Sequence, residues 1–223
     1  MHASDDTRLV RCFDGIAMSY WMIEHTYREV EKLPAMLKDN KKNIHRAFWL
    51  CWSFVDAVHR IRELTQAIPG LGSKKPQVRA FLYSTSVVEY FRNYVQHLRQ
   101  ELTKLPGNTF PVWGTLAWVD PDDELLCHIA LAGTLVGQMN YPGCVYDTVD
   151  RKWASKVTLS VGNKSINFDT IFTACLQFNN FIVPWLNSKY SPGIQVIDDL
   201  PVQSVRIEFP NGGDTDSGTD GRS

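Results

Sequence analysis

The chain has 223 residues, of which 44% are hydrophobic and 21% charged, as in a globular protein that can bury a substantial core. Its formal net charge of −1 excludes a global nucleic-acid footprint, so any binding of RNA would depend on local basic patches. The candidate patches are Lys41–Lys42–Arg46, Lys74–Lys75–Arg79 and Arg92–Arg99.

The cysteines and the hydropathy pattern bear on the cellular compartment of the protein. The odd number of cysteines and the lack of a CxxC pair argue against a disulfide framework, so we expect small buried side chains in a reducing compartment. No apolar run approaches the roughly 18 residues of a membrane span, and the polar start of the chain is unlike a signal peptide. We therefore expect a cytoplasmic protein without a membrane segment. The five cysteines are Cys12, Cys51, Cys127, Cys144 and Cys175.

The first half of the chain has the periodicity of long helices. Apolar residues at spacings of three and four predict helices over 5–33 and 41–68, the first breaking near Pro34 and the second ending at the PGLG of 69–72. Pro76 fits the first turn of a third helix, and no Gly or Pro follows before Pro106, which predicts one helix of about 28 residues. Three such helices with short connections predict an antiparallel bundle over 1–106.

The rest of the chain favours strands. We expect strands at 111–119 and 125–135, a hairpin turning at Gly162–Asn163, and a further strand near 144–148. A helix is predicted near 168–188, kinked or ended by Pro184, and a last strand at 202–209. The fold class is therefore α+β: a long-helix antiparallel bundle, then a small antiparallel sheet with one further helix. We expect this β-rich portion, 107–209, to pack on the bundle, and the tail 210–223 to be disordered.

The predicted third helix carries a buried face and a polar strip. Val88, Phe91, Val95, Leu98 and Leu102 share one side of the helix. The polar strip faces the other way, with Arg92 and Tyr90 on its flanks. It consists of Glu89, Asn93, His97 and Gln100.

Arg92 and His97 are the residue types that metal-free RNA cleavage requires. An imidazole can deprotonate a 2′-hydroxyl or protonate the departing 5′-oxygen, and a guanidinium can stabilise charge that builds on the phosphate. On one helix the two side chains point about 140° apart, so they converge poorly unless a second copy faces the first.

The segment RNYVQH, residues 92–97, resembles the RNxxxH form of the Rx4–6H motif of the HEPN superfamily (higher eukaryotes and prokaryotes nucleotide-binding). Like that motif, it lies on a late helix of a helical bundle, and the resemblance covers residues 5–105. It implies a HEPN-like bundle and a metal-independent endoribonuclease without a cofactor, of a kind common among toxins and antiviral defence effectors. Arg92 and His97 match the catalytic pair, and Asn93 matches the polar residue that follows the arginine.

The resemblance also implies the partners of the site. The two motif copies would meet at a homodimer interface, RNA would be the substrate, and an antitoxin or regulatory protein is a possible partner. Substrate-binding residues are expected around the catalytic pair, and no metal ligand is expected. The expected substrate-binding residues are Glu89, Tyr94, Gln96, Arg99 and Gln100.

Other readings stay open. The main alternative is a non-catalytic module that binds RNA, a nucleotide or a protein in the same groove, and a purely structural interaction protein is a third. Asp56, His59 and Arg60 could face one groove, although such clusters are commonly solvated. Trp113 and Trp118 could stack on bases, but core positions in the sheet fit them better. The histidines and cysteines show neither HxxxH nor CxxC spacing.

Overall fold

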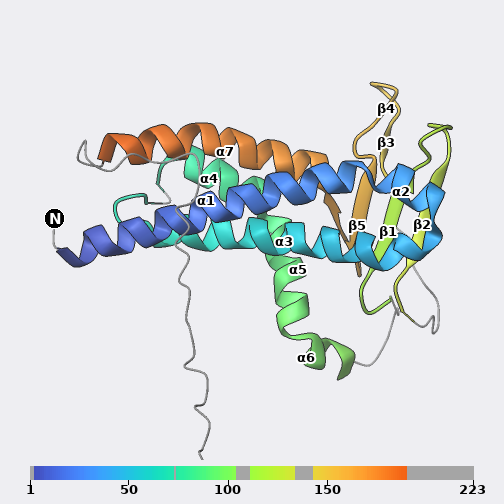
Figure 1. Cartoon of the computed structure of the whole chain (residues 1–223), viewed down its shortest axis with the longest axis horizontal. Coiled ribbons are helices and arrows are strands. Elements are labelled where there is room, and N and C mark those ends of the chain that lie inside the picture. Colours follow the sequence, from blue (N-terminus) through green and yellow to red (C-terminus); the bar gives the residue numbers. More distant parts are fainter. Residues whose placement is uncertain (1–2, 73, 104–110, 134–142, 190–223) are drawn as a thin grey trace, which may run out of the picture.

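Three long helices run side by side: α1 (Ala3–Glu31), α3 (Ile44–Ala67) and α7 (Phe168–Lys189) (Figure 1). This computed structural model describes residues 3–72, 74–103, 111–133 and 143–189. A short α2 (Leu33–Asp39) and a 3-10 turn, η1 (Lys41–Asn43), connect α1 to α3. The sequence predicted the three long helices closely, but it did not predict α2, and the residues of η1 were expected to begin the second helix.

The pairing of α1 with α3 follows from the sequence. Leu9, Ile16, Ile23 and Val30 recur every seven residues on α1, and all four are buried. A seven-residue repeat keeps one face of a helix against its neighbour over its whole length. Gly15 lies against the Leu64 side chain of α3, which allows the two helices a close approach.

The single helix predicted over 75–105 is wrong. The segment forms three helices, α4 (Pro76–Ser84), α5 (Ser86–Gln96) and α6 (Leu98–Thr103). At the two breaks, Thr85 (φ −101°, ψ 10°) and His97 (φ −106°, ψ 23°) leave helical geometry. Figure 1 shows α4 alongside α7, whereas α5 packs on α3 and, like α6, runs in a different direction from the long helices.

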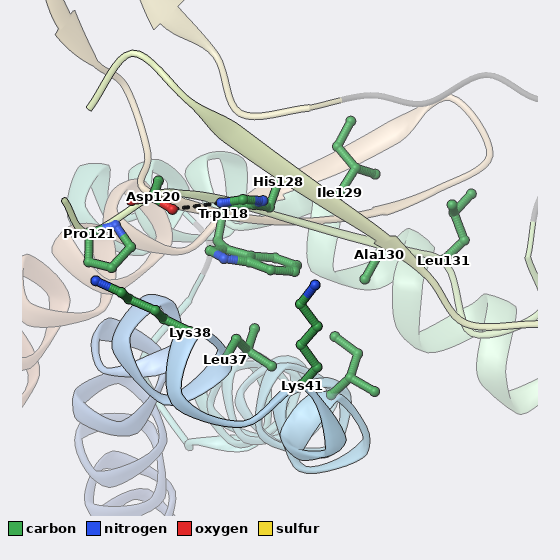
Figure 2. Close-up of a pocket in the computed structure, with 11 residues that line it drawn as sticks. Leu37, Lys38, Lys41, Trp118, Asp120, Pro121, His128, Ile129, Ala130 and Leu131 are labelled. Atoms are coloured by element: carbon green, nitrogen blue, oxygen red, sulfur yellow. Dashed lines mark hydrogen bonds and ion pairs between the residues drawn. The ribbon is translucent and has the colours of Figure 1, made fainter. Parts of the chain in front are cut away.

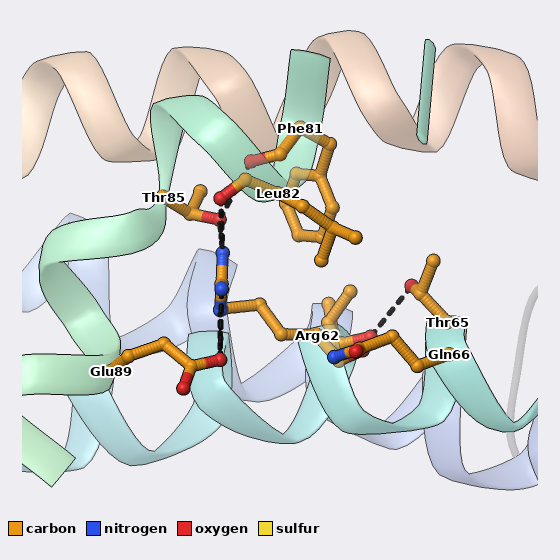
Figure 3. Close-up of polar contacts among 8 residues, drawn as sticks. Arg62, Thr65, Gln66, Phe81, Leu82, Thr85 and Glu89 are labelled. Atoms are coloured by element: carbon orange, nitrogen blue, oxygen red, sulfur yellow. Dashed lines mark hydrogen bonds and ion pairs between the residues drawn. The ribbon is translucent and has the colours of Figure 1, made fainter. Parts of the chain in front are cut away.

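The break at Thr85 has a physical cause that the local sequence conceals. The Thr85 hydroxyl donates to the carbonyl of Phe81 (2.7 Å), a contact that tends to bend helices. The same hydroxyl accepts a hydrogen bond from Nη1 of Arg62 (2.5 Å), and that nitrogen also donates to the Leu82 carbonyl (2.6 Å). Arg62 thus fills the bend from α3 with a buried guanidinium (Figure 3). No Gly or Pro marks the position.

Glu89 supplies the counterion for this buried cation. Its Oε1 accepts from Nε (3.1 Å) and Nη2 (2.8 Å) of Arg62, so a residue of the expected substrate-binding set is engaged within the fold. A buried arginine is tolerated only when it is paired and hydrogen-bonded. Arg62, Thr85 and Glu89 therefore form one unit that sets the angle between α4 and α5.

The main sheet has four antiparallel strands in the order β2-β1-β5-β6. They are β1 (Thr115–Val119), β2 (Cys127–Leu131), β5 (Val157–Val161) and β6 (Lys164–Asn167). Gly162, with φ 59°, turns the β5–β6 hairpin where the sequence predicted it. A separate pair, β3 (Tyr146–Asp147) and β4 (Lys152–Trp153), covers the expected strand near 144–148.

The sheet and the helices share one apolar core. Leu116, Leu159 and Ile166 of the sheet belong to the same buried cluster as Phe54 and Phe91 of the helices. The chain enters α7 directly after β6, and Phe168 at this junction packs edge-on against Phe54, with ring centroids 5.2 Å apart. The described strands thus pack on helices from both halves of the chain.

The α+β class, the small antiparallel sheet and the further helix are confirmed. Helix α7 continues through Pro184 to Lys189, so this proline does not end it. Leu102, expected on the buried face, is 59% exposed on α6. The predicted strand at 202–209, the tail 210–223 and the domain boundary at 106–107 lie outside the described residues. None of the described helices is long and apolar enough to cross a membrane.

We expect Thr85→Val to destabilise the fold by about 1–3 kcal/mol, because it removes an acceptor from a buried guanidinium while conserving volume. Urea unfolding measures this change in the free energy of unfolding. Ser84→Ala, at the exposed neighbouring position, is the control and should stay within about 0.5 kcal/mol of the parent. Equal stability of the two variants would contradict the role given to Thr85.

Candidate functional site

Helix α5 distributes the predicted site residues over different environments. Asn93 and Gln96 are exposed on α5, His97 is exposed at its end, and Arg99 and Gln100 are exposed on α6. Arg92 is half-buried and faces α3, and Glu89 is held by Arg62. The polar strip is therefore solvent-facing at Asn93, His97 and Gln100, and structurally engaged at Glu89.

Tyr94 does not lie where a substrate-binding residue was expected. Its side chain is buried, and its hydroxyl donates to the carbonyl of Val112 (2.8 Å). Burial raises the pKa of this phenol to about 12, so it stays protonated and a donor. Tyr94 thus anchors the segment before β1 to α5 and does not lie on the solvent-facing surface expected for substrate contact.

Arg92 forms an ion pair across to α3. Its Nε lies 3.2 Å from Oδ1 of Asp56, while Oδ2 of Asp56 accepts from Nε of Arg60 (2.8 Å). Nε of Arg92 is buried and has no hydrogen-bond partner among the described residues, so its contact with Asp56 is electrostatic. One carboxylate thereby serves two guanidiniums, which leaves part of the positive charge available to an anionic ligand.

Arg92 also lines a pocket of about 300 Å³, here called the tryptophan pocket. Trp49 and Trp52 come from α3 and Trp113 from the segment that Tyr94 anchors, and Trp52 donates its indole N–H to the carbonyl of Trp113 (3.3 Å). Trp113 meets Trp52 edge-on, with ring centroids 6.4 Å apart. Trp49 is 63% and Trp113 46% exposed, so their rings are accessible to a ligand. The remaining lining residues are Met22, Ser53, Val55, Asp56 and Val95.

This composition suits a planar aromatic ligand that carries a negative charge. Indole rings stack on bases with about 1–3 kcal/mol each, and a guanidinium next to them can bind a phosphate. Asp56 adds an acceptor for the amino groups of a base.

His97 does not line this pocket. It ends α5, where its carbonyl accepts from the backbone N–H of Gln100 (2.8 Å) and Glu101 (3.0 Å), and its side chain is exposed. Arg92 points toward α3 and His97 lies at the α5–α6 junction. Within one described chain, the two residues are therefore parts of different surfaces.

A second pocket, of about 530 Å³, lies between the α2–η1 turn and the sheet (Figure 2). Lys38 and Lys41 extend toward it from the helical side, facing Trp118 and the pair formed by His128 and Asp120. Nε2 of His128 and Oδ2 of Asp120 are 2.7 Å apart, and this hydrogen bond lowers the pKa of the Asp120 carboxyl. Lys38 is paired with Asp122. No spacing in the sequence indicated that these residues lie together.

The structure shows the surroundings of two sets of residues that the sequence left open, the charged set on α3 and the two tryptophans near the sheet. Of Asp56, His59 and Arg60, which could have faced one groove, only Asp56 lines the tryptophan pocket, and Arg60 forms an ion pair with it. Trp113 is half-exposed in the tryptophan pocket, and Trp118 stacks on His128 with ring centroids 5.4 Å apart.

Cys127 is exposed and Cys144 half-buried, so the expectation of buried cysteines is wrong for these two. All five cysteines are free.

The sequence reasoning missed Trp49 and Trp52, although a signal was present. Trp49, Trp52, Asp56, His59 and Glu63 recur at steps of three and four along α3, on a stripe separate from the residues that face α1. Tryptophans on a helix face that also bears charges are candidates for a binding surface.

Compared with models of known protein families, with curated protein sequences and with solved structures, the chain gives no match.

Proposed function

We propose that the protein is a metal-independent endoribonuclease of the HEPN type, in which Arg92 and His97 cleave RNA and no cofactor takes part. The observation that carries the proposal is that Arg92, on the helix with the RNYVQH motif, opens into the tryptophan pocket. A phosphate-binding group thus lies beside a surface that can stack a base. Each nucleotide of RNA carries both a phosphate and a base, so RNA can use both parts of this surface.

The chemistry assigns one task to each residue. His97 takes the proton of a 2′-hydroxyl, whose oxygen attacks the neighbouring phosphorus, and an imidazolium returns a proton to the departing 5′-oxygen. Arg92 stabilises the negative charge on the phosphate oxygens, and Asn93 orients the phosphate or the imidazole. The products are a 2′,3′-cyclic phosphate and a 5′-hydroxyl, and DNA is inert because it has no 2′-hydroxyl.

The active form in this proposal is a homodimer. Arg92 faces the pocket wall of its own chain and His97 is exposed beyond it, so a second copy would supply the histidine that faces each arginine. Tyr90 and Leu102 are exposed apolar side chains next to the polar strip, as an interface requires. A toxin or defence role in the cytoplasm, with an antitoxin or other protein as regulator, completes the proposal.

One observation favours the second candidate, a non-catalytic module that binds RNA or a nucleotide. Arg92 already has an anionic partner in Asp56, 3.2 Å away, and this pairing reduces its attraction for phosphate. Base stacking in the tryptophan pocket needs no catalytic histidine. The two candidates differ in whether RNA is cut.

We expect the full chain to cleave single-stranded RNA in EDTA, and His97→Ala and Arg92→Ala each to lower the rate by about 10²–10⁴-fold. Gel analysis of labelled RNA, with end-group mapping of the products, measures this. His45→Ala is the matched control, because His45 is also exposed but lies at the start of α3.

Cleavage by His97→Ala at the parent rate would exclude this mechanism, as would cleavage that stops on chelation while the fold is retained. If the parent binds RNA but cuts none, the non-catalytic candidate replaces it. Circular dichroism of each variant checks that the fold is retained.

Asp56→Asn should strengthen the binding of an RNA oligonucleotide by about 2- to 5-fold, because Arg92 then loses its competing counterion. The size of this gain corresponds to the free energy of a half-exposed ion pair. Fluorescence anisotropy measures the dissociation constant. Asp39→Asn, an exposed position outside both pockets, makes the same change in net charge and serves as the control. An equal gain in both variants would mean that Arg92 is not the group released.

We expect light scattering to show a dimer at micromolar concentration. Tyr90→Glu should shift it toward monomer, because a charge at the interface is costly to desolvate. Tyr83→Glu, a highly exposed tyrosine on α4, is the control. A parent protein that is monomeric at this concentration would contradict the proposed active form.

A further inference from the structure

Three side chains with metal-binding atoms converge between α3 and α5. His59 and Glu63 lie one turn apart on α3, and Glu89 faces them from α5. One ligand atom from each residue, an imidazole nitrogen and two carboxylate oxygens, lies within 4.8 Å of the others. This cluster is separate from the tryptophan pocket, whose lining includes none of the three residues.

The imidazole of His59 has an unmet bonding requirement. Its Nδ1 is buried and has no hydrogen-bond partner among the described residues. A ring nitrogen in this situation is rare in folded proteins, because burial without a partner costs free energy. This orphaned nitrogen is an observation independent of the proximity of the two carboxylates.

Glu89 is oriented in the way that metal ligands usually are. Arg62 donates two hydrogen bonds to Oε1, at 3.1 and 2.8 Å, and is itself fixed by Thr85 and the carbonyl of Leu82. Figure 3 shows the second carboxylate oxygen turned away from Arg62. Outer hydrogen bonds of this kind hold a ligating carboxylate in place.

Charge also favours a divalent cation. Glu63 and Glu89 bring two negative charges, and Arg62 offsets one of them, so these three side chains together carry one net negative charge. A net negative charge at the cluster attracts a cation.

We propose that His59, Glu63 and Glu89 form a binding site for one divalent transition-metal ion of the Zn²⁺ class. One imidazole and two carboxylates are a ligand set that Zn²⁺ accepts, with room for solvent at a further position, whereas Mg²⁺ and Ca²⁺ prefer oxygen alone. The ion links α3 to α5 one turn from the Asp56–Arg92 pair, since Asp56 precedes His59 by three residues and Glu89 precedes Arg92 by three. Its role is to hold the two helices together; it takes no part in cleaving RNA.

The experiment is a calorimetric titration of the full chain with Zn²⁺ after treatment with EDTA and removal of the chelator. Exposed Cys127 and half-buried Cys144 could also bind Zn²⁺, so Cys127→Ser/Cys144→Ser is the background for all variants. We expect one ion per chain in this background, at least about 10-fold weaker binding for His59→Ala and for Glu63→Gln, and no change for His45→Ala. The melting temperature should rise with Zn²⁺ and not with Mg²⁺.

Glu63→Gln keeps the test decisive if His59→Ala does not fold, because Glu63 is exposed and its amide analogue conserves size. Binding that is lost in the serine background, or that is unaffected by Glu63→Gln and His59→Ala, would overturn the site. Neither readout involves RNA, so the result is independent of the proposed nuclease activity.

Discussion

The arrangement of the site depends on one buried cation, Arg62. Its guanidinium is almost wholly enclosed, and its hydrogen bonds to Thr85, Leu82 and Glu89 all reach the segment where α4 ends and α5 begins. A buried arginine without these acceptors would be strongly destabilising, so the chain must keep the bend in order to satisfy the charge. Because of the bend, α5 leaves the direction of α4 and packs on α3 and β6. That placement brings Arg92 to Asp56.

The same constraint explains where sequence reasoning succeeded and failed. The long helices α1, α3 and α7 and the β5–β6 hairpin were predictable, because periodicity and a glycine turn encode them locally. The bend at Thr85 was not, because its cause is an arginine 23 residues earlier in the chain. A segment with good helical spacing and no Gly or Pro was therefore interpreted as one helix, and tertiary hydrogen bonds override that pattern.

For the candidate site, the sequence located the helix but not its surroundings. The motif indicated Arg92, Asn93 and His97, and the expected divergence of Arg92 from His97 agrees with their separate surfaces in the described chain. The sequence did not assign Glu89 and Tyr94 to internal contacts, because their partners, Arg62 and Val112, lie on other segments. Trp113 illustrates the same limit: only the anchoring of its segment by Tyr94 shows that its ring lines a pocket with α3.

Helix α3 emerges as the element that couples stability to the site. Its inner face belongs to the core, where Cys51, Val58 and Ile61 are fully buried, and the helix packs along α1. Its outer stripe carries Trp49, Trp52 and Asp56 at the tryptophan pocket, then His59 and Glu63 at the cluster with Glu89. Both outer sites are completed by α5, so a change in the angle between α3 and α5 alters them together. Arg62 of α3 hydrogen-bonds to Glu89 of α5 and to the bend between α4 and α5, and thus connects the geometry of the pocket to the packing of the fold.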